Sequence, residues 1–254
     1  MAPEVVTRRG AVTRLLLLGV AVALLAGACG QRSDAPAGSG GQPRPAVGAV
    51  RTAALAPVRH PSAPRFRGGS AMIGPRTRAR MRWSWRPGCP VGLGDLRRLL
   101  VDHWGFDGRV HRGELVVHRR QAQRVLRVLA ELFSGRFPIQ RMRLVDAYRA
   151  DDDRSMAANN TSAFNCRRVS GTSRWSEHAY GRAIDLNPVQ NPYVTRGGRV
   201  SPPAGRRYAN RARRAKGMVH AGDPVVRAFA AVGWGWGGSW RSARDYQHFS
   251  STGR

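Results

Sequence analysis

The sequence predicts an α+β domain in which helices flank a small antiparallel sheet. Two observations predict this class. Some segments repeat apolar residues at helical spacing, as Val125, Val128, Leu129 and Leu132 do. Other, shorter segments alternate apolar and polar residues, as half-buried strands do. Helices mixed with short strands in one chain are typical of the α+β class.

Three segments carry the helical pattern. The first begins at Asp95, whose side chain is a suitable helix cap. The other two end at Gly135 and Gly233, a residue type that commonly terminates helices. The predicted helices are 95–106, 121–135 and 223–234.

Strands are predicted where short segments are rich in β-branched residues or alternate in polarity. These segments are 113–118 (GELVVH), 141–149 (RMRLVDAYR) and 183–187 (AIDLN). A long polar loop, 150–181, separates the last two, and such loops in compact domains are often functional. We expect its first part, ADDDR, to be a solvated border of a cleft.

The N-terminal part has the features of an export signal. Arginines in residues 1–14 precede an uncharged run of 14 residues, which is too short to span a membrane comfortably. We therefore predict a signal peptide over 1–28 of the lipoprotein type, with lipidation of Cys29. Plain secretion is the alternative. Residues 29–80 are rich in Pro, Gly, Ala and Arg and are expected to be a disordered linker, so the folded domain would span 81–254.

The net charge of +28 would suit a nucleic-acid-binding protein. Three observations argue against that class. The positive charge is almost entirely arginine, with Lys216 the single lysine, and it is spread along the chain. The export signal also carries the protein away from the chromosome. We expect an anionic partner outside the cytoplasm, either a cell-wall polymer or a membrane surface, no nucleic acid, and a monomer by default.

With Cys29 lipidated, Cys89 and Cys166 are left as one possible pair. Exported chains more often join two such cysteines than leave both free. Neither lies in a CxxC or CxxH pattern, which argues against zinc binding by these thiols. We predict a disulfide between them.

The stretch SEHAYGRAID places His178 and Asp185 seven positions apart. On a flat strand these residues would face opposite sides, so both can bind one metal ion only if the chain bends, and Gly181 is where it could. A catalytic zinc site needs three protein ligands and one open position. His248 can be the third ligand, and Asp245, three residues earlier, could act as a general base.

These residues form two motifs that resemble the signatures of the M15 metallopeptidases, which are D-alanyl-D-alanine carboxypeptidases and related peptidoglycan endopeptidases. The first motif, S-x-H-x-x-G-x-A-x-D, is met by Ser176, His178, Gly181, Ala183 and Asp185. The second, W-x(4)-D-x-x-H, is met by Trp240, Asp245 and His248. The resemblance, to the VanY-like core of the family, spans residues 83–249 and implies a Hedgehog/DD-peptidase-like zinc peptidase fold.

The resemblance implies a role for each motif residue. His178, Asp185 and His248 would bind Zn²⁺, and Asp245 would be the base that activates the attacking water. Arg149 or Arg167 would hold the substrate carbonyl, and the sequence does not decide between them. Support of the ligands would fall to Ser176, Gly181 and Trp240.

The expected activity is zinc-dependent hydrolysis of peptidoglycan stem peptides at the outer face of the membrane or in the wall. It would be that of a D,D-carboxypeptidase or an L-Ala–D-Glu endopeptidase. Asp245 stands where the carboxypeptidases usually have Glu, which resembles the endopeptidase branch. The alternative function is that of a non-catalytic wall-binding or scaffolding protein of the same fold.

Overall fold

The computed structural model describes residues 63–254, and all structural statements below concern these residues. The predicted signal peptide, Cys29 and most of the predicted linker lie outside them. Within the described part of the chain, no helix is both long and apolar enough to cross a membrane.

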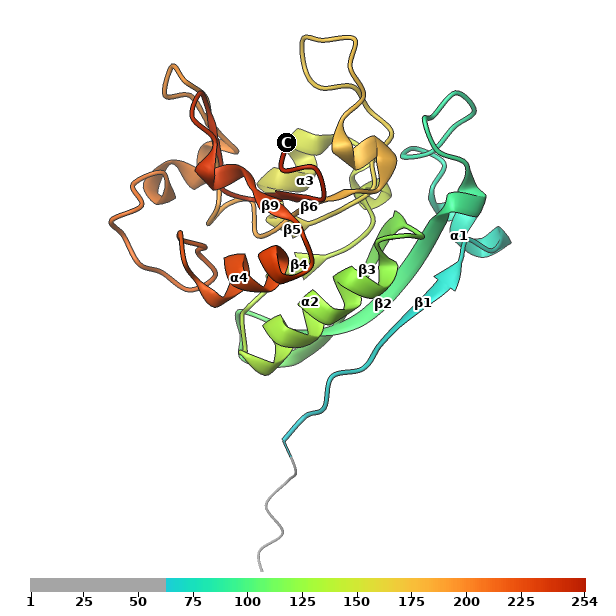
Figure 1. Cartoon of the computed structure of the whole chain (residues 1–254), viewed down its shortest axis with the longest axis horizontal. Coiled ribbons are helices and arrows are strands. Elements are labelled where there is room, and N and C mark those ends of the chain that lie inside the picture. Colours follow the sequence, from blue (N-terminus) through green and yellow to red (C-terminus); the bar gives the residue numbers. More distant parts are fainter. Residues whose placement is uncertain (1–62) are drawn as a thin grey trace, which may run out of the picture. The chain divides into compact units, whose positions relative to one another are not determined.

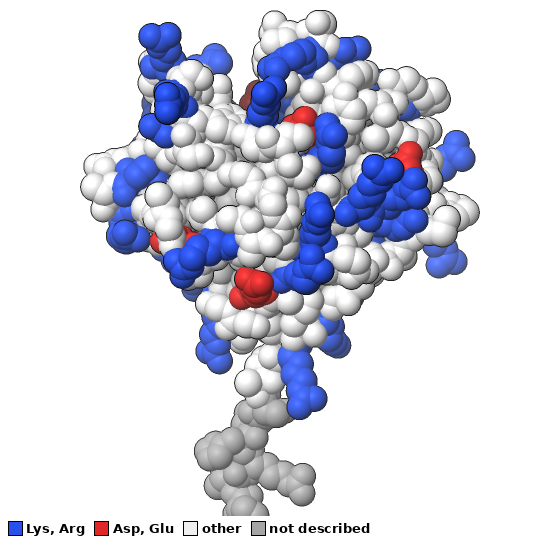
Figure 2. Space-filling model, in the orientation of Figure 1, with Lys and Arg blue, Asp and Glu red and all other residues white. Residues whose placement is uncertain are grey.

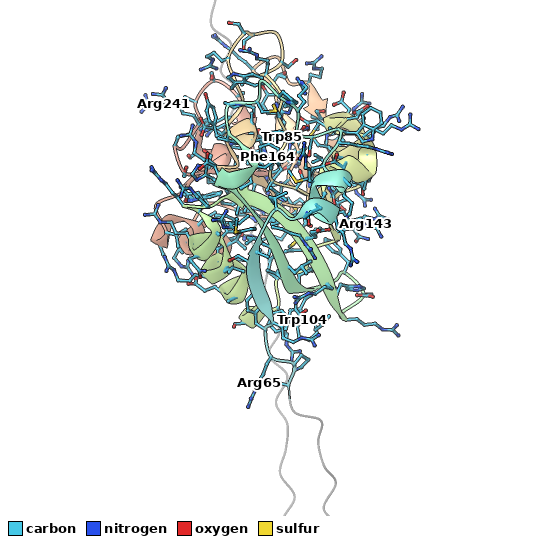
Figure 3. All side chains as sticks on the ribbon, turned by 90° about the vertical axis from the view of Figure 1, so that its right-hand side faces the viewer. Arg65, Trp85, Trp104, Arg143, Phe164 and Arg241 are labelled. Carbon is cyan, nitrogen blue, oxygen red and sulfur yellow. A yellow bond between two sulfur atoms is a disulfide. The ribbon has the colours of Figure 1, made fainter. Side chains whose placement is uncertain are left out.

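The largest sheet has three antiparallel strands in the order β1-β2-β3. Strands β2 and β3 pair over nine residues, and β1 pairs with the other edge of β2. Helix α2 lies against this sheet (Figure 1) and buries Val125 and Leu129 against Leu99, Val101 and Leu115. The three strands also lie side by side in the view of Figure 3. Their bounds are Gly68–Met72, Leu96–Trp104 and Val110–His118, and α2 spans Ala122–Ser134.

A second, smaller antiparallel sheet has the order β6-β11-β9 and carries one potential ligand from each motif, Asp185 on β6 and His248 on β11. Phe249 on the central strand is fully buried and stacks on Phe229 of α4, with ring centroids 3.9 Å apart. This aromatic contact packs strand β11 against helix α4. The strands are Ala183–Asp185, His248–Ser250 and Gly235–Trp236, and α4 spans Pro224–Ala231.

Short elements connect the two sheets. Strands β4 (Arg141–Met142) and β5 (Asn160–Thr161) form a parallel pair. A third three-stranded sheet has the order β10-β7-β8, and its strands span Arg244–Asp245, Tyr193–Val194 and Val200–Ser201. The remaining α-helices are α1 (Pro75–Arg80) and α3 (Asp152–Ala157). Five 3₁₀ helices complete the described elements: Leu93–Asp95, Val145–Tyr148, Glu177–Tyr180, Pro203–Tyr208 and Gly237–Ser239.

The structure confirms the α+β class with small antiparallel sheets. It also confirms the helices predicted over 121–135 and 223–234 and the strands predicted over 113–118 and 183–187, within a few residues at their ends.

The helix predicted over 95–106 is wrong, because this segment is strand β2. Strand β2 has neighbours on both edges and buried residues on both faces, including Leu96 beside Met81 and Leu99 under α2. A strand covered on both faces reads as an apolar run, and such a run can mimic helical spacing.

Three further expectations are corrected. Only Arg141–Met142 of the predicted strand 141–149 pairs as a strand, because Asp146 accepts hydrogen bonds from the backbone N–H groups of residues 83 and 84 and the chain turns there. Part of the predicted linker, 68–80, forms β1 and α1. The side chains of β1 are exposed, so no apolar pattern marked it as a strand.

The third correction concerns the ADDDR stretch, which is not only a solvated border. Asp151 caps helix α3 by accepting a hydrogen bond from the Arg154 N–H. Asp152 accepts a hydrogen bond from the side-chain amide of Asn165 at 2.7 Å. These contacts tie the start of α3 to the segment that leads into the first motif.

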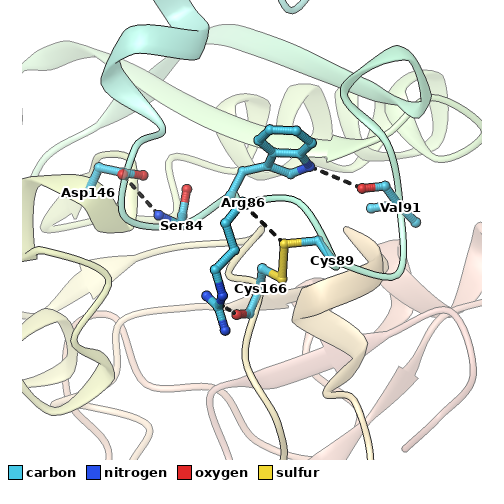
Figure 4. Close-up of a disulfide and its surroundings, with 7 residues drawn as sticks. Ser84, Arg86, Cys89, Val91, Asp146 and Cys166 are labelled. Atoms are coloured by element: carbon cyan, nitrogen blue, oxygen red, sulfur yellow. Dashed lines mark hydrogen bonds between the residues drawn. A yellow bond between two sulfur atoms is a disulfide. The ribbon is translucent and has the colours of Figure 1, made fainter.

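The predicted disulfide between Cys89 and Cys166 is present (Figure 4). It closes a sequence separation of 77 residues and joins the loop after α1 to the chain that leads into the first motif. Arg86 strengthens the same junction, since its guanidinium donates to the carbonyl oxygen of Cys166 at 3.2 Å (Figure 4).

Basic side chains are scattered over the face shown in Figure 2 and do not gather in one patch. This distribution agrees with the spread of arginines along the sequence. It gives no support on this face to a nucleic-acid-binding surface, which would concentrate positive charge.

Candidate metal centre

The first motif is a short 3₁₀ helix followed by strand β6. Ser176 begins the 3₁₀ helix, and its hydroxyl accepts a hydrogen bond from the backbone N–H of His178 at 3.3 Å. Gly181 ends it with a left-handed backbone, φ +65°. A Cβ at Gly181 would lie 2.5 Å from the backbone nitrogen of His118, so only glycine fits. The chain therefore bends at Gly181, as predicted, and His178 comes back toward Asp185.

The second motif meets the first across a sheet. His248 and Asp185 are directly opposite each other in the antiparallel pair β11 and β6. Residues directly opposite in such a pair have neighbouring side chains on one face. On its other edge, Asp185 exchanges two backbone hydrogen bonds with Ser162, of 2.9 and 3.1 Å. The position of Asp185 is therefore fixed from both sides.

Three potential metal-ligand atoms converge at this point. The Nε2 atom of His178 lies 3.2 Å from one carboxylate oxygen of Asp185, and the Nδ1 atom of His248 lies 3.2 Å from the other. The two ring nitrogens are 3.3 Å apart. Ligands bound tetrahedrally to zinc at about 2.0–2.1 Å are separated by about 3.3 Å. The two histidine nitrogens, and each nitrogen with its nearer Asp185 oxygen, have this spacing. One ligand atom from each residue forms a triangle in which all atoms lie within 4.8 Å of one another, so these residues could hold a metal ion.

Each histidine uses its other ring nitrogen to contact a backbone carbonyl. The Nδ1 of His178 donates to the carbonyl oxygen of Ala163 at 2.6 Å. The Nε2 of His248 donates to the main-chain oxygen of Arg254 at 2.9 Å. Hydrogen bonds of this kind fix the tautomer and orientation of metal-binding histidines. They leave the two converging nitrogens free to accept a metal.

The charges at the site favour an ionised carboxylate beside a cationic group. Burial raises the pKa of the Asp185 carboxyl, but the imidazoles of His178 and His248 outweigh it and hold the pKa well below its usual range. Burial lowers the pKa of His248, yet its hydrogen bond to Asp185 and the negative charges of Asp185 and Asp245 raise it to about 9. A divalent cation would replace the proton on His248 and keep the Asp185 charge balanced.

Asp245 lies half-buried on β10, beside the ligands but outside the converging set. Its Oδ1 is buried and has no hydrogen-bond partner among the described residues. Burial raises the pKa of this carboxyl to about 6, opposed by the charges of His248 and His178 and helped by the charge of Asp185. A free acceptor oxygen with a pKa near 6 suits a general base.

The other predicted site residues differ in their surroundings. The Trp240 ring lies 5.4 Å from the His248 ring, measured between centroids, and its Nε1 donates to the Gly253 carbonyl at 2.7 Å. Arg167 is ion-paired with Asp152. Arg149 is exposed, with a left-handed backbone, and no acidic side chain in residues 63–254 pairs with it.

Sequence reasoning missed the two backbone carbonyls that orient the histidines. Any residue type can supply a carbonyl, so Ala163 and Arg254 carry no signature that could have revealed them. Only the fold brings these atoms to the rings.

Comparison with known proteins finds the M15 family over part of the chain. Residues 170–251 match the family model described as D-alanyl-D-alanine carboxypeptidase, of the M15 peptidases. The matched part contains all three potential ligands and Asp245, and is narrower than the span of 83–249 over which the resemblance was drawn. No curated protein and no solved structure matches the chain significantly. Residues 170–251 are therefore a domain of the M15 peptidase family, which implies a Hedgehog/DD-peptidase-like fold.

Proposed function

We propose that this protein is a zinc-dependent peptidase that hydrolyses peptide bonds in the stem peptides of peptidoglycan. The observation that carries the proposal is the triangle of His178, Asp185 and His248 beside the half-buried carboxylate of Asp245. A purely structural metal site has no need of an unpartnered carboxylate next to it. The family of residues 170–251 supplies the substrate class.

His178, Asp185 and His248 would hold the zinc ion. Bound zinc would supply Lewis-acid chemistry, polarising a carbonyl and lowering the pKa of a water toward about 7. Asp245 would take the proton from the attacking water at its free Oδ1 and pass it to the leaving amine. With a pKa near 6, it is mostly ionised at neutral pH and can accept that proton.

An arginine would hold the substrate carbonyl while negative charge develops on its oxygen. Of the two candidates, we favour Arg149, because Arg167 already pairs with Asp152. Replacing each by Lys separates them. The residue that binds the carbonyl should lose turnover, since a lysine cannot reproduce the planar guanidinium fork.

The disulfide and the peptidoglycan-acting family both indicate an extracytoplasmic location. We propose export by the signal peptide 1–28, anchoring through a lipid on Cys29, and a tether from there to the folded domain. The exposed arginines would then face anionic wall polymer or phospholipid headgroups, with the protein acting as a monomer.

The test is a digest of defined muropeptides by the purified protein, read by mass spectrometry, with and without a chelator. The Asp245→Asn variant serves as a zinc-loaded control for contaminating peptidases. A chelator-sensitive mass loss, absent in the variant, would identify the bond as a terminal D-Ala or an L-Ala–D-Glu bond. If folded, zinc-loaded protein cleaves no stem peptide, the enzyme assignment fails and a wall-binding role replaces it.

A further inference from the structure

The C-terminal segment, residues 251–254, folds back onto the candidate metal centre. Figure 1 shows the C-terminal end of the chain beside β6 and β9. We propose that this segment positions the metal ligand His248 through the main-chain oxygen of Arg254. The inference rests on the metal site of the proposed function and assigns a role to residues that neither motif includes.

The central contact is the hydrogen bond from Nε2 of His248 to the main-chain oxygen of Arg254, at 2.9 Å. The same oxygen accepts a second hydrogen bond, from the Ser250 hydroxyl at 2.7 Å. The acceptor is thus itself held in place. With Nε2 carrying the proton, the lone pair of the neutral ring is on Nδ1, which faces Asp185 at 3.2 Å.

Two hydrogen bonds fix the segment to the motifs on either side. The backbone N–H of Ser251 donates to the carbonyl of Arg182, inside the first motif, at 3.0 Å. The indole Nε1 of Trp240, in the second motif, donates to the carbonyl of Gly253 at 2.7 Å. Trp240 therefore acts on His248 twice, by ring packing and by holding the residue before the acceptor.

Close packing against β9 adds to this fixation. A Cβ at Gly235 would lie 2.7 Å from the Cα of Gly253, so only a glycine lets the segment approach this strand. The Arg254 side chain is exposed and forms no ion pair with the described residues. The segment therefore acts through its backbone, and the identity of the side chain at position 254 should not matter.

The two ring anchors differ in origin. The carbonyl that holds His178 belongs to Ala163, a buried residue of the main core. The oxygen that holds His248 belongs to a partly exposed segment outside both core clusters. His248 is therefore the ligand whose orientation can be altered selectively.

The experiment measures zinc affinity by chelator competition on the otherwise intact chain. One variant deletes Thr252–Arg254, which removes both acceptor oxygens and keeps the Ser251 contact. Trp240→Phe keeps an aromatic ring beside His248 and removes only the N–H donor to Gly253. The matched control is Arg254→Ala, which keeps the main-chain oxygen that His248 contacts.

We expect the deletion to weaken zinc binding by about 10- to 100-fold, the range typical of lost partners of metal-bound histidines. Trp240→Phe should weaken it in the same direction, and Arg254→Ala should bind zinc as the wild type does. Proton NMR of zinc-loaded protein adds a direct readout. The His248 Nε2 proton should exchange slowly with water in the wild type and in Arg254→Ala, and faster in the other two variants.

Wild-type affinity in the deletion variant would overturn the inference, and so would an equal loss in Arg254→Ala. If the deletion variant does not fold, Trp240→Phe decides, and an unchanged affinity and proton exchange rate there would overturn it. A wild type that binds no zinc would overturn this inference and the proposed function together. If the wild type binds zinc and the deletion variant binds it with the same affinity, this inference alone is overturned.

Discussion

The affinity of the protein for zinc should rise steeply with pH between 6 and 9. His248 has a pKa raised to about 9, because Asp185 and Asp245 stabilise its charged form more than burial destabilises it. Zinc and the proton compete for Nδ1 of this ring, so a proton must leave whenever zinc binds. An ordinary histidine, with a pKa near 6.5, would have lost that proton already at neutral pH.

The size of the effect follows from the pKa. At pH 7, two units below about 9, roughly one metal-free molecule in 100 has the unprotonated ring. Apparent zinc affinity at pH 7 should then be about 100-fold weaker than well above pH 9, a difference of about 2.7 kcal/mol. Each unit of pH between 7 and 8.5 should gain close to a factor of ten.

Chelator competition at several pH values measures this dependence, once the chelator's own protonation is corrected for. An affinity that stays flat between pH 7 and 8.5 would refute the reasoning, since that is the behaviour of a histidine with an ordinary pKa. It would show that Asp185 and Asp245 do not hold a proton on His248 in the metal-free protein.

Four further outcomes are expected. In metal-free protein the raised pKa of His248 stabilises the fold by about 3 kcal/mol. This stability is complete below about pH 6.5 and is lost as pH rises through about 9, so the melting temperature should fall between these two pH values. Asp245→Asn should retain zinc and lose turnover by roughly 10²–10⁴-fold in a muropeptide assay, and normal turnover would remove Asp245 as the base. His178→Ala should lose zinc on metal analysis, and a fully loaded variant would contradict the ligand assignment. Replacing Cys89 and Cys166 by Ser opens a loop with a separation of 77 residues and should lower the free energy of unfolding by about 4.5 kcal/mol. The melting temperature should then fall by about 10 °C or more. A fall of only a degree or two would mean that the disulfide adds little stability.

The sequence was most informative where chemistry requires particular side chains at a particular spacing. His178, Asp185 and His248 could be grouped from the sequence alone, because a zinc site needs three such donors and Gly181 allowed the bend between two of them. It was least informative for strand β2, whose leucines have helical spacing although the segment is buried between neighbours on both edges. Whether an apolar run is a strand or a helix is decided by what covers it, and the covering residues lie far away in the chain.

The same distinction explains why the support of the site escaped prediction. A ligand must be a histidine or a carboxylate, so it leaves a signature, but the acceptor behind a ligand can be any backbone carbonyl. His178 and His248 both depend on such an acceptor, one from Ala163 and one from Arg254. A scan that replaces side chains one at a time would find the ligands and miss both carbonyls, since Arg254→Ala leaves its carbonyl in place. Deletion of the segment tests what substitution cannot, because the interaction belongs to the backbone.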